Sequence, residues 1–214
     1  MHICGLCKTT IERPTHFDKE NIPYFKCPVC GIIQEDCSFY PSEGEEKNRY
    51  DQHNNTSEDP RYVAYLSDIG KRTITPFVSA GKPVLDFGCG PEPVLANLLK
   101  QAGYKTYYYD LFYFPDTDYC NNMYGGIAAI EVLEHIYNLN TTFNTLLSLL
   151  EPGGFLIFRT ELFTGSKTDF PKWWYQRDPT HISLFTPDTI HYIKEIFSLT
   201  KRAWINNREF VLQA

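Results

Sequence analysis

Short apolar runs alternate with segments of helical period along the last two thirds of the chain. A run without polar residues is typical of a strand that is buried on both faces, and helices would cover those faces. This alternation predicts an α/β fold with a parallel, Rossmann-like sheet. The predicted strands are 84–86, 105–109, 127–130 and 155–158, and the predicted helices include 94–99 and 187–197.

The end and the middle of the predicted sheet depart from simple alternation. Residues 199–205 and 210–212 should form a closing hairpin around an Asn-Asn pair, which makes the last strand antiparallel. Only sixteen residues separate Asp110 from Ile127, too few for a helix, a strand and a further turn. We therefore expect that a helix is missing there and that the intervening strand is short.

Changes in composition divide the chain into three parts. Residues 1–40 hold two pairs of cysteines and few large apolar side chains. Residues 41–82 should form a linker and leading helices, because Asp59 and Pro60 suit an N-cap and a first helical position. Residues 83–214 would then be the main domain.

Composition and charge exclude some classes of protein. The 214 residues carry a net charge of −6, and 43% are hydrophobic, as in ordinary globular proteins. The negative charge offers no basic surface for a nucleic acid. No apolar run approaches about 20 residues, so we expect no membrane span. The N-terminus shows no signal peptide, which makes a cytoplasmic location the expectation.

The paired cysteines indicate a metal site. Cys4 and Cys7 form one C-x-x-C pair, and Cys27 and Cys30 form a second after nineteen intervening residues. In a cytosolic chain such pairs more often hold metal than disulfides, and four thiolates suit a tetrahedral Zn²⁺. Redox-active dithiols are the alternative. The first 40 residues carry four basic and five acidic side chains, which favours a structural or substrate-gating ribbon over one that binds nucleic acid.

The strand that ends near Asp86 is followed by a glycine turn, with Gly88 and Gly90, and then by a helix. Glycines let a ligand touch the backbone, and the first N–H groups of the helix point at it. A dinucleotide fingerprint would need a third glycine where the chain has Pro93. The Asp86 carboxylate would oppose a pyrophosphate but suit a ligand with an ammonium group. A purely structural turn is the alternative.

An acid also ends the second predicted strand. Asp110 lies twenty-two residues after the first glycine of the turn, where βαβ units place a ribose-binding carboxylate. Leu111 and Phe112 could sandwich an adenine ring, and Asp118 and Tyr119 are the nearest other candidates for an adenine contact. A structural role for Asp110 is the alternative.

Candidate catalytic groups follow the next strand. Glu131 to His135 lie at its carboxyl end, and such residues line the ligand crevice of an open α/β sheet. His135 is a candidate base. Ordering of the loop is the alternative role.

The stretch between the last parallel strand and the final helix is unusually aromatic. Trp174, Tyr175 and Arg177 would suit a flat or anionic acceptor. His181 could take a proton from an acceptor hydroxyl, because histidine titrates near neutrality. The alternatives are a hydrophobic plug and a His181 that bonds a backbone carbonyl and holds the loop.

The motifs C-x-x-C (twice), D-F-G-C-G-P, E-V-L-E-H and D-P-T-H occur in one chain. Together they resemble bacterial class I S-adenosylmethionine (SAM)-dependent methyltransferases of the methyltransferase domain 23 group that carry an N-terminal zinc ribbon. The resemblance spans nearly the whole chain. It implies a class I sheet with an antiparallel last strand, SAM as cofactor, and methyl transfer to an O- or N-nucleophile, with a small molecule favoured.

The resemblance also implies roles for single residues. The segment before the first strand closes over SAM in many such enzymes, which points to Tyr50 and His53. Relatives commonly have glycine where this chain has Glu92, which could narrow the methionine site. Two other functions stay open: an inactive SAM-binding module and a ribbon-guided nucleic-acid methyltransferase. The other implied SAM contacts are Asp86, Gly88, Gly90, Asp110, Leu111, Phe112 and Glu131.

Overall fold

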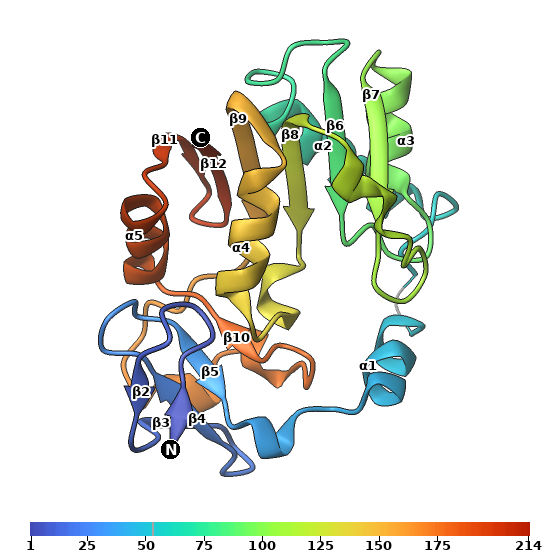
Figure 1. Ribbon diagram of the computed structural model, residues 1–214. Coiled ribbons are helices and arrows are strands. Elements are labelled where there is room, and N and C mark those ends of the chain that lie inside the picture. The colour runs from blue at the N-terminus through green and yellow to red at the C-terminus, as the bar shows by residue number, and fades with distance from the viewer. Residues whose placement is uncertain (53) are drawn as a thin grey trace.

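The computed structural model describes residues 1–52 and 54–214. Its centre is a six-stranded sheet in the order β11-β12-β9-β8-β6-β7 (Figure 1). β6 to β9 run parallel and β12 is antiparallel to β9, which confirms the predicted class I sheet. The strands are β6 (Pro83–Phe87), β7 (Lys105–Tyr109), β8 (Tyr124–Ile130), β9 (Leu150–Arg159), β11 (Thr200–Ile205) and β12 (Glu209–Gln213).

β11 and β12 form the predicted closing hairpin. Asn206 and Asn207 take φ angles of 53° and 55°, a left-handed conformation that asparagine tolerates better than most residues. Trp204 lies opposite Phe210 in the register, and their rings pack 5.1 Å apart. A local turn preference and a cross-strand aromatic pair therefore fix this end of the sheet.

The segment between β7 and β8 is simpler than expected. Its described residues, 110–123, hold a single 3-10 helix (Thr117–Asn121) and an isolated bridge between Asp110 and Phe114, but no strand. The missing helix is confirmed, and the short intervening strand is wrong. β7 is therefore an edge of the sheet, and Tyr119 packs against it.

Helices cover both faces of the sheet (Figure 1). α2 and α3 pack against Val84 and Ile157, while α4 and α5 pack against Leu85 and Phe158. Successive strand residues point to opposite faces, so burial on both sides explains the uninterrupted apolar runs. The helices are α1 (Glu43–Tyr50), α2 (Pro60–Thr73), α3 (Val94–Gln101), α4 (Leu139–Ser148) and α5 (Pro187–Ile196).

Side-chain caps set the starts of three helices. Ser42 and Glu45 form a reciprocal capping box at α1. Asp59 caps α2 and Pro60 occupies its first turn, as predicted. Thr186 caps α5. None of the described helices has the length and apolar character that a membrane span requires.

The N-terminal segment shares a sheet with a distant part of the chain. β3, β4 and β5 are extended by β10, which pairs antiparallel with β5. Gln34 is buried beside this pairing, and its amide donates to Ser183 Oγ at 2.8 Å. The strands are β1 (His2–Ile3), β2 (Thr10–Ile11), β3 (His16–Phe17), β4 (Pro23–Lys26), β5 (Ile33–Glu35) and β10 (Ser183–Leu184).

Candidate functional site

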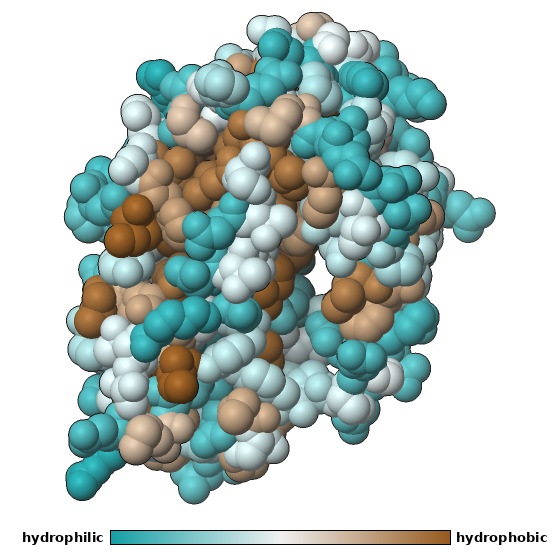
Figure 2. Space-filling model, in the orientation of Figure 1, coloured by the Kyte–Doolittle hydropathy of each residue, from teal (hydrophilic) through white to brown (hydrophobic). Residues whose placement is uncertain are grey.

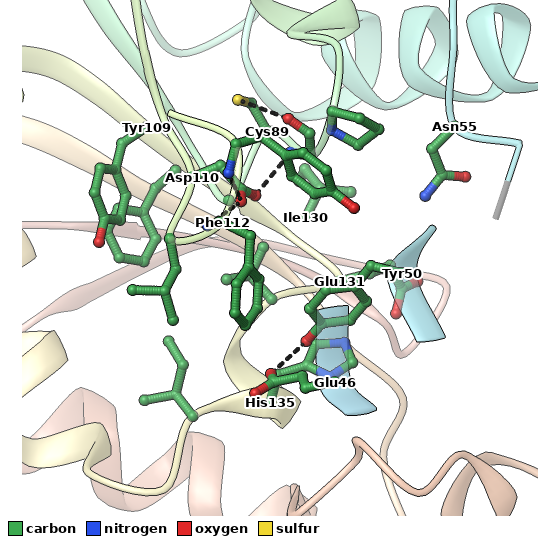
Figure 3. Close-up of a pocket in the computed structure, with 18 of the residues that line it drawn as sticks. Glu46, Tyr50, Asn55, Cys89, Tyr109, Asp110, Phe112, Ile130, Glu131 and His135 are labelled. Atoms are coloured by element: carbon green, nitrogen blue, oxygen red, sulfur yellow. Dashed lines mark hydrogen bonds between the residues drawn. The ribbon is translucent and has the colours of Figure 1, made fainter. Parts of the chain in front are cut away.

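A cavity of about 890 Å³ lies at the carboxyl ends of β6, β7 and β8. The turn after β6, the loop after β7, the end of β8 and α1 contribute to its wall (Figure 3). Residues of α4 and of the loop after β9 also line it. The surface is hollowed on the side where α1 faces the sheet (Figure 2). Open α/β sheets bind ligands at this edge, and the volume is within the range of small-molecule and cofactor sites.

The glycine turn after β6 forms one end of the cavity. Gly88 has a φ of 80° and lies so close to Val132 that a Cβ atom would meet the valine side chain at 2.4 Å. Gly90 has a φ of 72° and open space where its Cβ would stand. The backbone N–H groups of Gly88 and Cys89 donate to the Tyr109 carbonyl. The turn is thus fixed to β7 and leaves Gly90 open to the cavity.

Asp110 ties the loop after β7 to this turn. Its Oδ2 accepts the Gly90 N–H at 2.9 Å, and its Oδ1 accepts the N–H groups of Phe112 and Tyr113 at 2.9 and 3.2 Å. Leu111 and Phe112, which follow Asp110 in the chain, also line the cavity. The structure therefore brings together the glycine turn, Asp110, and Leu111 and Phe112, the two residues predicted to contact the adenine ring.

Asp86 is placed differently from expectation. It is only 4% exposed and does not line the cavity. It points to the same face as Val84, where its Oδ2 accepts the Ala96 N–H of α3 at 3.2 Å. Burial raises the pKa of Asp86 to about 7, and the charge of Asp110 adds to the shift. The residue alternation along β6 thus turns this carboxylate away from the cavity.

Glu131 follows β8 in a left-handed conformation, with a φ of 55°. Its carboxylate lies 3.0 Å from Arg159 Nε and accepts the hydroxyls of Tyr65, at 3.3 Å, and Tyr175, at 2.8 Å. Glu131 lines the cavity as predicted, but these partners hold it in place. Arg159 and Tyr65 come from β9 and α2, and sequence reasoning missed both.

Glu134 lies behind the cavity wall and is fully buried. Its Oε1 is also within hydrogen-bond distance of the Tyr175 hydroxyl, which therefore lies between two carboxylates. The hydroxyl has one hydrogen and donates it to one of the two at a time. Burial, together with the charge of Glu131, raises the pKa of Glu134. Tyr175 lines the cavity, yet its hydroxyl is engaged by these acids.

Two histidines stand next to each other at the other end of the cavity. The rings of His135 and His181 are 4.8 Å apart. Nδ1 of His135 lies 2.9 Å from the Thr180 carbonyl, and Nδ1 of His181 lies 2.7 Å from the Tyr175 carbonyl. A carbonyl only accepts, so each Nδ1 carries the hydrogen. Burial lowers the pKa of His181.

α1 forms the outer wall. Tyr50 packs against Phe112 at 5.7 Å and edge-on to His135 at 5.2 Å, so it bridges the two ends of the cavity (Figure 3). Arg49 donates from Nε and Nη2 to Asp178 in the loop after β9, at 3.1 and 2.7 Å. The prediction for His53 lies outside the described residues.

The aromatic loop contributes its predicted residues to the cavity mouth. Trp174 is 57% exposed and lines the cavity. Arg177 also lines it, and its Nη2 donates to the Lys172 carbonyl at 3.1 Å. The Trp174 ring and the Arg177 guanidinium therefore both lie at the cavity mouth, where the cavity opens to solvent.

The four paired cysteines converge outside the cavity. Their sulfurs lie within 4.8 Å of one another, with 3.5 Å between Cys4 and Cys30 and 3.3 Å between Cys7 and Cys27. A tetrahedral zinc with Zn–S bonds of about 2.3 Å separates its sulfurs by about 3.8 Å. After the second knuckle, Gly31 takes a φ of 75°, which closes the turn. The arrangement is consistent with a zinc ribbon.

Comparison with known proteins gives the family. Residues 49–197 match the family model described as a methyltransferase domain, Methyltransf_23, and this match covers more than half of the chain. The chain belongs to this methyltransferase family. The predicted resemblance is confirmed, and the cysteine cluster lies outside the matched residues. No sequence among the curated proteins matches the methyltransferase.

Solved structures share the fold of this methyltransferase. The pyocyanin biosynthetic protein PhzM aligns with a TM-score of 0.51 at 11% identity, over 78% of this chain and 61% of its own. Coclaurine N-methyltransferase, bound to N-methylheliamine and S-adenosylhomocysteine (SAH), aligns with a TM-score of 0.47 at 15% identity, over 72% of this chain and 53% of its own. An O-methyltransferase family protein from Burkholderia thailandensis aligns with a TM-score of 0.47 at 12% identity, over 83% of this chain and 64% of its own. The chain thus spans between half and two thirds of their length, and the likeness to PhzM shows the fold alone.

Glu92 does not narrow the cavity of the methyltransferase. Its Oε2 accepts the backbone N–H of Ser57 at 2.7 Å, and the side chain does not line the cavity. Glu92, which stands where relatives commonly have glycine, therefore anchors the segment before α2 through its hydrogen bond with Ser57. Acidic side chains at turns commonly accept hydrogen bonds from nearby backbone N–H groups. The sequence pattern therefore could not indicate that Glu92 would bond to Ser57.

Proposed function

We propose that the protein transfers a methyl group from SAM to a small-molecule acceptor with an oxygen or nitrogen nucleophile. The observation that carries the proposal is that one cavity runs from the glycine turn and Asp110 to the paired histidines His135 and His181. A cofactor and an acceptor can therefore meet in a single cavity. The methyltransferase family assignment supports the same reaction class.

The end with the glycine turn suits the nucleoside of SAM. Gly90 leaves open space where a Cβ would stand, and Asp110 is held by three N–H donors. Its Oδ2 accepts only one of them and keeps a lone pair for a ribose hydroxyl. Leu111 and Phe112 offer apolar surfaces for adenine, with the Tyr109–Tyr119 pair, 4.5 Å apart, as a further wall. The amino-acid end would extend toward Glu131 and Tyr50.

The other end suits an acceptor. The reaction is a displacement in which the nucleophile attacks the sulfonium methyl, the S–CH₃ bond breaks and its electron pair stays on sulfur. Such a reaction depends on positioning and on exclusion of water. α1 lines one side of the cavity, and Trp174 and Arg177 favour a flat or anionic molecule. His135 and His181 stand where the proton of an acceptor must leave.

The cysteine cluster supports a structural zinc. Cys4, Cys7, Cys27 and Cys30 present four sulfurs within 4.8 Å of one another, close to the spacing of about 3.8 Å in a tetrahedral zinc site. The knuckles join strands of only two to four residues, which are too short to be stable alone. Zinc would hold these strands, and through β5 it would support the neighbouring β10.

Two measurements test the function. Calorimetric titration with SAM and SAH should show binding to the full chain. Incubation with methyl-labelled SAM and a cell extract, followed by separation of small molecules, protein and RNA, should place the label among small molecules. Binding without any labelled product would favour the inactive binding module, and label in RNA would favour the nucleic-acid methyltransferase.

A further inference from the structure

Glu46 is an acidic side chain of the cavity wall that the proposed function does not use. It lies on α1 and lines the cavity. Its carboxylate stands beside Tyr50 and His135, at the end of the cavity away from Cys89 and the glycine turn (Figure 3). We propose that Glu46 binds a protonated amine of the methyl acceptor, so that the protein selects flat molecules with a cationic nitrogen. This inference rests on the proposed function and names its substrate class.

The half-buried carboxylate of Glu46 keeps one oxygen for a ligand. Its Oε1 accepts the Tyr50 hydroxyl at 2.7 Å, whereas its Oε2 has no hydrogen-bond partner among the described residues. Burial raises the pKa of Glu46, and the charges of Glu43 and Asp110 add to this shift. A cation bound at Oε2 would favour the charged carboxylate and offset the cost of its burial.

The other carboxylates that line the cavity already have strong donors. Asp110 is held by three backbone N–H groups, and Glu131 and Asp178 each pair with a guanidinium. No ion pair among the described residues involves Glu46, because the two bases that follow it on α1 pair with other acids. Glu46 is therefore the cavity carboxylate whose charge the described residues leave uncompensated.

Aromatic side chains line the cavity together with this carboxylate. The rings of Tyr50, Phe112 and Trp174 belong to its wall, and the first two pack 5.7 Å apart. Aromatic faces attract cations and also suit a flat molecule. Arg177 stays exposed at the cavity mouth, where it can meet an anionic group of the same acceptor. The wall thus favours a flat molecule whose positive end lies at Glu46.

Glu46 is a positioning residue in this proposal. A charge-assisted hydrogen bond from the amine to Oε2 would fix one point of the acceptor, and the aromatic wall would fix its plane. Glu46 precedes residues 49–197, which the family model matches. Selection of the amine would therefore come from the leading segment of this chain rather than from the methyltransferase domain that follows it.

The test uses the full chain saturated with SAH. Phenethylamine and phenethyl alcohol, which share a ring and a chain but differ in charge, are titrated by calorimetry at neutral pH. Phenethylamine should bind at least tenfold more tightly, and Glu46→Gln should remove this preference, because hydrogen bonds to charged groups are the stronger ones. Glu43→Gln makes the same change at an exposed position of α1 outside the cavity and should keep the preference.

The outcomes separate this inference from the proposed function. Binding of neither probe, equal binding of both, or an unchanged preference in Glu46→Gln overturns the role of Glu46. SAH affinity should be the same in Glu46→Gln and the parent, and a tenfold loss would instead assign Glu46 to the ammonium group of the cofactor.

The incubation with methyl-labelled SAM and a cell extract gives a second readout. The labelled small molecules should be retained by a cation exchanger at acidic pH. Labelled products that are not retained overturn the amine acceptor and leave the methyltransferase function standing. A parent protein that does not bind SAH overturns the proposed function, and this inference with it.

Discussion

The backbone N–H of Gly90 donates to the Asp110 carboxylate at 2.9 Å, so the turn after β6 and the loop after β7 are joined by one charge-assisted hydrogen bond. This bond places two predicted SAM contacts from adjacent strands at one end of the cavity. Asp110, the proposed ribose ligand, also supports the loop that carries Phe112, because its Oδ1 accepts the Phe112 N–H.

Asp110→Ala removes this shared acceptor. We expect SAH affinity to fall by roughly 1–3 kcal/mol, the usual loss for a charged hydrogen-bond partner, and calorimetry measures it. Asp116→Ala, which removes an exposed carboxylate from the same loop, is the matched control and should bind normally. Equal affinities for the two variants would contradict the ribose assignment.

The ion pair between Arg49 and Asp178 fixes α1 over the cavity. Its side chains are 34% and 15% exposed, and two guanidinium nitrogens contact one carboxylate oxygen. Arg49→Ala should lower stability by about 1 kcal/mol and the melting temperature by about 2–4 °C, as measured by thermal unfolding.

The ion pair of the exposed Arg61 with Asp59 provides the comparison for this variant. Arg61 is 91% exposed, so Arg61→Ala should leave the melting temperature nearly unchanged. An equally small effect for Arg49→Ala would mean that the Arg49–Asp178 pair does not hold α1 in solution.

Buried Asp86 makes stability depend on pH. Its pKa is about 7 in the folded protein, above the ordinary value of 3.8, so the folded state holds the proton more tightly. Stability should therefore fall as the pH rises from about 4 to 7 and level off above this range. Asp86→Asn keeps an acceptor for the Ala96 N–H and removes the cost of ionisation.

Urea unfolding of Asp86→Asn at pH 5 and pH 8 measures this effect. The advantage of the variant over the parent should grow by at most about 3 kcal/mol between the two values, at about 1.4 kcal/mol per pKa unit. Asp118→Asn, at an exposed position, should show no such growth. A constant difference across pH would show that Asp86 is ionised in the fold at both values.

Removal of zinc should affect more than the N-terminal segment. Cys27→Ser, or a chelator, should release about one zinc per chain and lower the melting temperature, because β5 and β10 share a sheet. Metal analysis and thermal unfolding check this. Cys37→Ser replaces an exposed cysteine of the same segment and should retain the zinc. A parent protein without zinc but with full stability would refute the structural role.

Local patterns determined the elements of this protein. The apolar runs, the Asn-Asn turn, the cap at Asp59 and the C-x-x-C pairs each act over a few residues, so the sequence alone predicted the sheet, the closing hairpin, the start of α2 and the cysteine cluster. The glycine turn and the position of Asp110 likewise follow from the spacing within one βαβ unit.

Tertiary structure alone decided how distant segments meet. β10 has two residues, too few to show a period, and it forms because the open edge of β5 lies beside it. The pairing of Arg49 with Asp178 and the approach of Glu134 to His181 depend on packing between segments far apart in the chain. Sequence periodicity carries no information about such contacts, because they are set by which surfaces are buried together.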